Sequence, residues 1–232
     1  MDTIVAKITN DSLMDKKIYE QAGKILREGG LVAFPTETVY GLGADALDEE
    51  ASAKIYAAKG RPSDNPLIVH IADIEALYKL SCEVPDKALK LADKFWPGPL
   101  TMILKKSDIV PDSITGGLGT VAIRMPSHKV AAELIRTSGV YIAAPSANTS
   151  GKPSPTRASH VIKDLSGKID MIIEDDTVDI GVESTIIDLS EEVPTILRPG
   201  YITKEMFEEV IGGVRIDPAI TEGVKSGVVP KA

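Results

Sequence analysis

Short apolar runs and amphipathic stretches follow one another along most of this 232-residue chain. Residues 18, 22, 25 and 26 are apolar, the spacing of one face of a helix, and a Gly-Gly pair follows at 29–30. Similar patterns predict helices at 16–28, 49–58, 86–95, 128–136 and 204–211. Apolar runs predict strands at 4–8, 31–34, 67–70, 100–105, 121–125, 140–144, 171–174, 185–189 and 195–197. Strands and helices do not alternate strictly, so the pattern predicts an α/β fold in which helices pack on a mixed sheet.

One substantial domain is expected, because 232 residues of which 43% are apolar suit a single core. After Gly212 the chain consists largely of glycine, proline, lysine and small apolar residues without periodicity. We therefore expect a domain over residues 1–212 and the start of a linker at 213–232.

The formal net charge of -8 argues against a bulk electrostatic grip on RNA. The single cysteine, Cys82, allows no internal disulfide and no metal site built from cysteines. The three histidines are too scattered along the sequence to indicate a built-in metal site. No apolar run approaches the roughly 18 residues of a membrane-spanning helix, and the N-terminus lacks a signal-peptide pattern. These features predict a cytoplasmic protein.

Candidate chemistry lies in polar segments that follow predicted strands, where α/β sheets usually bind ligands. The GxxxxGK[ST], GxGxxG and GxSxG signatures are missing from the sequence. After the strand at 31–34 comes PTETVY, whose hydroxyls, Thr36 and Thr38 among them, could orient a small polar ligand or merely cap a turn. Ser146 and Asn148 offer a hydroxyl and an amide from one turn after the strand at 140–144.

Several cationic residues could meet anionic ligands. Lys59 and Arg61 are separated by one glycine and could address one polyphosphate, although a solvated basic turn has the same pattern. Arg124 lies in an apolar strand, so its guanidinium needs a partner, either a bound carboxylate or an internal salt bridge. His70 ends a predicted strand, where a histidine is more often structural than a ligand.

Seven segments, in this order, resemble the YrdC family of L-threonylcarbamoyladenylate synthases. They are FPTETVYGLG (34–43), AKGRPSDNPLIVHI (58–71), WPGPLT (96–101), VAIRMP (121–126), AAPSANTSGKPSPT (143–156), GVESTIID (181–188) and LRPG (197–200). The resemblance covers roughly residues 15–211 and implies a YrdC-like twisted mixed sheet with a concave ligand-binding cleft. Longer members of the family continue into a linker and a small second domain, so the resemblance implies that residues 213–232 begin such a linker.

The resemblance also implies two adjoining pockets. The L-threonine site would consist of Thr36, Thr38, His70, Arg124, Ala144 and Ser184. The ATP site would consist of Arg61, Asn65, Thr120, Ser146, Ser154 and Arg198. The KxR and SxN motifs of the family would supply the catalytic groups, Lys59, Arg61, Ser146 and Asn148. No resident metal is implied, but Mg²⁺ would accompany ATP, held mostly by phosphate oxygens and water.

The implied reaction is that of a nucleotidyltransferase. The threonine amine would capture carbon dioxide from bicarbonate, and the new carboxylate would attack the α-phosphorus of ATP and release pyrophosphate. Positioning and charge stabilisation could suffice without a general base. The product would pass to a threonylcarbamoyl-transferase complex that modifies tRNA next to the anticodon. Two alternatives stay open: a module that binds double-stranded RNA or tRNA, and a carbamoyl-transfer domain.

Overall fold

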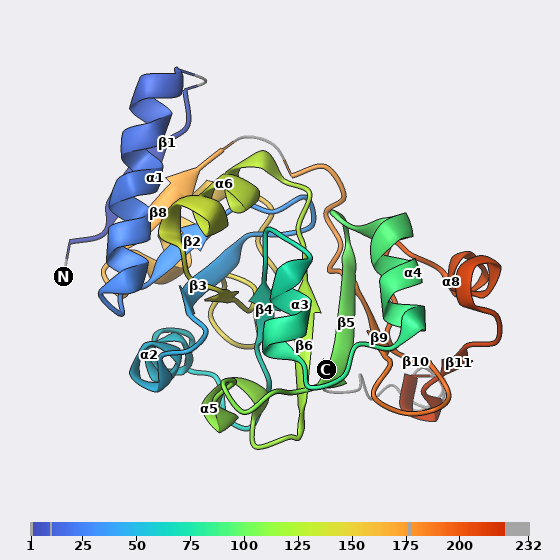
Figure 1. Ribbon diagram of the computed structural model, residues 1–232. Coiled ribbons are helices and arrows are strands. Elements are labelled where there is room, and N and C mark those ends of the chain that lie inside the picture. The colour runs from blue at the N-terminus through green and yellow to red at the C-terminus, as the bar shows by residue number, and fades with distance from the viewer. Residues whose placement is uncertain (1, 10, 176–177, 221–232) are drawn as a thin grey trace.

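The computed structural model describes residues 2–9, 11–175 and 178–220, which form a sheet of 11 strands with helices packed on it (Figure 1). The strands stand in the order β1-β8-β2-β3-β7-β4-β6-β5-β9-β10-β11. Their bounds are β1 (Ile4–Lys7), β2 (Val32–Phe34), β3 (Gly41–Asp45), β4 (Ile68–His70), β5 (Leu100–Lys105), β6 (Thr120–Arg124), β7 (Ile142–Ala143), β8 (Met171–Glu174), β9 (Thr185–Asp188), β10 (Thr195–Arg198) and β11 (Arg215–Ile216).

Helices cover both faces of this sheet. Their bounds are α1 (Ser12–Arg27), α2 (Glu49–Lys59), α3 (Glu75–Leu80), α4 (Asp86–Phe95), α5 (Asp112–Thr115), α6 (Lys129–Ser138), α7 (Ala158–Leu165) and α8 (Lys204–Ile211). Side chains of β2 alternate between two apolar clusters, with Val32 and Phe34 in one and Ala33 in the other. Helices α1 and α6 pack over the first cluster, and α2 packs over the second (Figure 1).

The sheet is mixed, as predicted. Strand β4 pairs parallel with β6 and antiparallel with β7, while β5 pairs antiparallel with β6 and parallel with β9. The prediction of an α/β fold with a mixed sheet is therefore confirmed. The twist and the concave cleft that the resemblance implied stay predictions.

Capping residues fix the start of α1 and both ends of α2. Asp11 accepts hydrogen bonds from the backbone of Leu13 and Met14, so α1 begins earlier than the apolar pattern predicted. Asp48 caps the start of α2, and Gly60 ends the helix in the left-handed region at φ 62°. Lys59 is therefore the last helical residue and stands at the entrance to the loop that leads to β4.

Five elements were not predicted: β3, α3, α5, α7 and β11. Strand β3 escaped prediction because glycines interrupt its apolar pattern. A Cβ atom at Gly43 would lie 2.6 Å from Ile142 Cγ2 and 2.8 Å from Phe34 Cε1, so these two side chains occupy the space that a larger residue would need.

The described chain continues in contact with the sheet beyond residue 212, where the sequence predicted the domain to end. Val214 is buried in the main core, and Arg215–Ile216 pairs with β10 as the last strand of the sheet. The short polar sequence around these residues carries no periodicity, so its pairing could not be seen from the pattern. The part of the expected linker from residue 221 onward lies outside the described residues.

Candidate functional site

A row of buried polar residues crosses the middle of the sheet. His70 on β4 is the register partner of Arg124 on β6, and Arg124 is in turn opposite Thr101 on β5. Register partners project from the same face of a sheet, so these three side chains form one row. Ser184 extends the row immediately before β9, because its Oγ lies 2.7 Å from Thr101 Oγ1. All four residues are buried.

Arg124 pairs with Glu37, which comes from the segment after β2. Arg124 Nη2 donates to Glu37 Oε1 at 2.7 Å, and both side chains are buried. Of the two partners considered from the sequence, the internal salt bridge is present. Burial alone would raise the pKa of Glu37, but the charge of Arg124 and its hydrogen bond lower that pKa below the ordinary value. Within the described residues, Glu37 Oε2 and Arg124 Nε have no hydrogen-bond partner.

His70 is a neutral imidazole at neutral pH. Burial, with the charge of Arg124 as the second cause, lowers the pKa of His70 to about 3. Its Nδ1 lies 3.0 Å from the carbonyl oxygen of Ile68, and a carbonyl can only accept, so Nδ1 carries the proton. The ring also meets Phe34 edge-on.

The hydroxyls after β2 are partly used by their own turn. Thr36 Oγ1 donates to the carbonyl of Val39 at 2.6 Å and lies 3.0 Å from Thr38 Oγ1. Turn capping, one of the two interpretations of this segment, is therefore present. Ala144, directly after β7, is buried and donates its backbone N–H to the carbonyl of Ile68. Ala144 and the two threonines therefore lie close to the ends of β2, β4 and β7.

Lys59 and the predicted SxN motif meet at the end of α2. Lys59 Nζ donates to the carbonyl oxygens of Ser146 and Asn148, the latter at 2.7 Å. Arg61 Nη2 donates to the carbonyl of Pro66 at 3.2 Å, while its buried Nε has no partner in the part of the chain that the structure describes. The structure thus brings three of the predicted catalytic residues together, Lys59, Ser146 and Asn148, with Arg61 two positions beyond Lys59.

A third group of contacts joins the segment before β9, the last residue of β10 and the loop after β7. Arg198 donates to the carbonyl of Ser184 at 3.0 Å and to its hydroxyl at 3.1 Å. Arg198 Nη1 also lies 2.8 Å from Glu183 Oε2, and Ser154 Oγ donates to Glu183 Oε1 at 2.7 Å. Burial lowers the pKa of the Arg198 guanidinium. Three residues predicted for two pockets, Ser154, Ser184 and Arg198, therefore share one network.

Two predicted residues are not joined to these contacts. Asn65 and Thr120 are half-buried, and within the described residues neither side chain is linked to the others by a hydrogen bond. The carbonyl of Asn65 accepts from the hydroxyl of Tyr56 at 3.1 Å. The segment before Asn65 packs against Gly116, because a Cβ there would lie 2.6 Å from the carbonyl oxygen of Asp64.

Three polar members of the site were not predicted: Glu37, Thr101 and Glu183. Glu37 is the lone carboxylate between two threonines, which is a usable signal once Arg124 is known to need a counter-charge. Thr101 carries no signal of its own, because its place beside Arg124 depends on the register of β5 and β6. Glu183 lies within a segment noted from the sequence, but its pairing with Arg198 is a tertiary contact.

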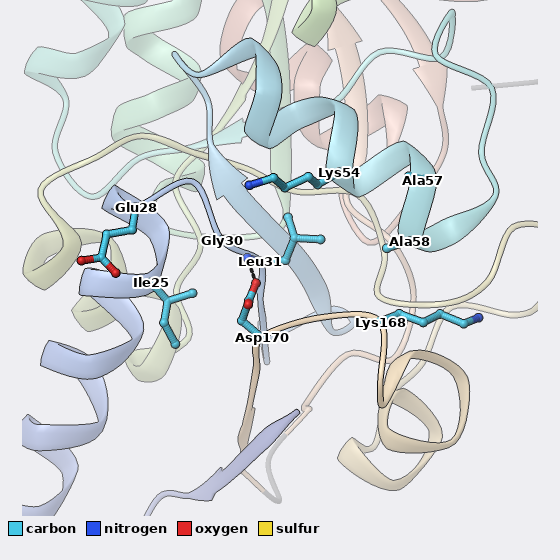
Figure 2. A pocket seen from close by; sticks show the side chains of 9 residues that line it. All are labelled: Ile25, Glu28, Gly30, Leu31, Lys54, Ala57, Ala58, Lys168 and Asp170. Carbon is cyan, nitrogen blue, oxygen red and sulfur yellow. Dashed lines mark hydrogen bonds between the residues drawn. The ribbon is translucent and has the colours of Figure 1, made fainter. Parts of the chain in front are cut away.

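A pocket of about 660 Å³ opens at the other end of β2 and is not this site (Figure 2). Two of its polar side chains are hydrogen-bonded within the protein. Asp170 Oδ2 accepts from the backbone N–H of Leu31 at 2.8 Å, and Lys54 Nζ donates to the carbonyl of Gly29 at 2.6 Å. Leu31 precedes β2, whereas the site residues Thr36, Glu37 and Thr38 follow that strand. None of the predicted site residues lines this pocket.

Two further findings concern membrane-spanning helices and metal-binding groups. Among the residues that the structure describes, no helix is long and apolar enough to cross a membrane. The same residues contain no group of three or more His, Cys, Asp or Glu side chains that could hold a metal ion.

Comparison with known proteins relates the whole core to one family. The family model described as "Telomere recombination" (Sua5_yciO_yrdC) matches residues 24–200. The threonylcarbamoyl-AMP synthase of Pyrococcus abyssi is 57% identical over 94% of this chain and 64% of its own length. The enzyme of the same name from Bacillus subtilis is 55% identical over 96% of this chain and 65% of its own length.

Solved structures agree with these sequence matches. The structure of P. abyssi Sua5 in complex with L-threonine superposes with a TM-score of 0.90 at 55% identity, covering 95% of this chain and 64% of that one. The chain thus spans somewhat less than two thirds of the length of these three relatives. Since the matches cover nearly all of the sheet and every site residue, the chain belongs to the Sua5/YciO/YrdC family.

Proposed function

We propose that the chain makes L-threonylcarbamoyladenylate and pyrophosphate from L-threonine, bicarbonate and ATP. The observation that carries this proposal is the buried row of Arg124, neutral His70, Thr101 and Ser184, which adjoins a second cluster around Lys59 and Ser146. Two adjoining polar clusters suit an amino acid and a nucleotide. The threonine complex of P. abyssi Sua5, 55% identical to this chain, supports the assignment.

The threonine pocket would lie along the buried row. Arg124 keeps an unpartnered Nε among the described residues, and a guanidinium held in a buried site suits the carboxylate of an amino acid. Glu37 holds its negative charge beside Arg124, which suits the substrate ammonium. Thr38, Ala144 and Ser184 would complete the pocket, with Thr36 supporting the turn that carries Thr38.

The ATP pocket would lie across the loops that follow α2, β7 and β10. Arg61 and Arg198 would meet the phosphates, because each has a guanidinium near these loops. Four polar residues would complete the pocket: Asn65, Thr120, Ser146 and Ser154. Mg²⁺ would arrive with ATP and be held by phosphate oxygens and water, since the described residues include no carboxylate cluster for it.

The reaction would proceed in two bond-forming steps. The threonine nitrogen attacks carbon dioxide derived from bicarbonate, an N–C bond forms and the amine loses a proton. An oxygen of the new carboxylate then attacks the α-phosphorus of ATP, and the bond from that phosphorus to the bridging oxygen breaks as pyrophosphate leaves with the electron pair. Buried donors already in place would stabilise the developing charge without reorganisation.

We further propose that the product serves threonylcarbamoyl transfer to tRNA next to the anticodon, by a separate transferase complex in the cytoplasm. The free, exposed Cys82 is compatible with a reducing compartment.

The test is incorporation of radiolabelled bicarbonate into an adenylate, measured with pyrophosphate release. Label should enter only when threonine and ATP are both present. Arg124→Met should abolish incorporation, while Lys105→Met, which removes an exposed cation from the neighbouring strand, should not. Pyrophosphate release that is equal with and without threonine would refute the synthase. RNA binding without incorporation, or label entering only from carbamoyl phosphate, would favour one of the alternative functions.

A further inference from the structure

The side-chain ammonium of Lys59 is fully occupied by protein oxygens. Lys59 is 2% exposed, and its Nζ donates to the carbonyl oxygens of Ser146 and Asn148. The side-chain oxygen of Asn148 lies 3.5 Å from the same nitrogen. An ammonium has three donors, and three oxygens from one loop surround it. The position therefore leaves Lys59 without a donor for a further ligand.

These contacts fasten one loop to the end of α2. The backbone N–H of Ser150 donates to the carbonyl of Lys59 at 2.9 Å, so both main chain and side chain of the lysine hold the loop. Inside the loop, Asn148 Nδ2 donates to the carbonyls of Thr149 at 2.9 Å and Lys152 at 2.8 Å. The carbonyls of Ser146 and Asn148 converge on one point, which is favourable only when a donor with positive charge sits there.

Arg61 differs from Lys59 in each of these respects. It is only half-buried, and within the described residues its side chain makes one hydrogen bond, to the carbonyl of Pro66, while its Nε has no partner. Its guanidinium therefore has donors to spare, whereas the lysine has none. The two cations of this KGR segment are thus equipped for different tasks.

We infer that Lys59 is a positioning residue that fastens the loop carrying Ser146 and Asn148 to helix α2 and does not contact the phosphates of ATP. The inference rests on the proposed function for the identity of the nucleotide. It revises the catalytic role expected for Lys59 from the resemblance. Arg61 and Arg198 would then supply the positive charge at the phosphates.

The electrostatics of Lys59 agree with a structural task. Burial, with the charge of Arg61 as the second cause, lowers the pKa of Lys59 to about 7. The positive charge is therefore costly to bury at this position, and the carbonyl oxygens around it offset part of that cost.

The first arm of the test needs no ligand. Hydrogen exchange of residues 146–152 is measured for the unmodified chain, Lys59→Met, Arg61→Gln and Lys54→Met. Lys54 is the matched control, because it lies on the same helix and donates to a backbone carbonyl, that of Gly29, away from the site. Exchange should become about tenfold faster or more only in Lys59→Met, the effect of losing a charge-assisted hydrogen bond. Unchanged exchange in Lys59→Met would overturn the inference.

The second arm uses AMP, ADP and ATP in calorimetry. Lys59→Met should weaken all three by a similar factor, because the loop contacts what the three share. Arg61→Gln should weaken them by a factor that grows with the number of phosphates. A loss in Lys59→Met that grows from AMP to ATP would show phosphate contact and overturn the inference. If the unmodified chain binds none of the three, the proposed function fails, and the exchange arm still decides the role of Lys59 in the loop.

A third measurement covers the case in which Lys59→Met does not fold. The unmodified protein is labelled with ¹⁵N at lysine Nζ and titrated with ATP, with Lys59→Arg used to identify the resonance. The hydrogen-bonded Nζ resonance should keep its position and its protection from solvent. Its displacement by ATP, in a manner that pyrophosphate reproduces, would contradict the inference.

Discussion

Arg124 and Glu37 hold opposite charges 2.7 Å apart where neither side chain reaches solvent. Removing one charge leaves the other buried without compensation. Glu37→Gln should therefore lower the free energy of unfolding by about 3 kcal/mol, and Glu37→Gln combined with Arg124→Met should recover part of the loss. Urea unfolding measures both. Glu83→Gln, which breaks the exposed pair with Lys105, should change little. Equal stability of Glu37→Gln and the unmodified protein would mean that water reaches Arg124.

His70 gives the stability a defined dependence on pH. Its pKa is about 3 in the folded protein, whereas an unperturbed histidine titrates near 6.5. Between these values the unfolded chain binds a proton that the folded protein does not, so stability is lost as the pH falls below about 6.5. The slope from this residue is about 1.4 kcal/mol per pH unit.

Urea unfolding at pH 7 and pH 5 checks this sign. His70→Gln should reduce the difference between the two values, whereas His160→Gln, on an exposed turn of α7, should leave the difference as it is. An undiminished difference in His70→Gln would assign the pH dependence to other groups.

At the scale of elements, β3 is a strand that the sequence pattern did not predict. Apolar periodicity predicted most strands and helices, because burial of one face dictates it. Strand β3 contains Gly41 and Gly43, over which side chains of the neighbouring strands pack, and that requirement exists only in the assembled sheet. The same applies to the site. Arg124 could be predicted as a site residue because a buried guanidinium needs a partner. Thr101 belongs to the site only because the register of β5 and β6 places it opposite Arg124.

The requirement at Gly43 is testable. Gly43→Ala would place a Cβ 2.6 Å from Ile142 Cγ2, so it should lower the free energy of unfolding by about 1–3 kcal/mol. Gly119→Ala is the control, because nothing lies within 4 Å of a Cβ at that position. Thermal unfolding of the two variants compares them directly. A smaller effect at Gly43 than at Gly119 would show that the side chains of Phe34 and Ile142 move aside freely.

At the scale of the molecule, the two polar clusters come from different parts of the sheet. Arg124 lies on β6 in the buried row. Arg61 follows α2, two positions after Lys59. Arg61→Ala should weaken ATP binding about tenfold or more with little effect on threonine, and Arg124→Ala should do the reverse. Calorimetry with each ligand on each variant measures this. Equal losses for both ligands in both variants would contradict a division into two pockets.

Arg198 connects the buried row to a residue of the proposed ATP pocket. One guanidinium reaches Ser184 of the buried row and, through Glu183, Ser154 of the nucleotide loops. Under the proposed function, a ligand in either pocket would act on a side chain that the other pocket shares, and the two binding free energies would be interdependent. Thermodynamic linkage then requires reciprocity: the factor by which ATP changes the affinity for threonine is the factor by which threonine changes the affinity for ATP. Substitution of Arg198 should bring that single factor towards one.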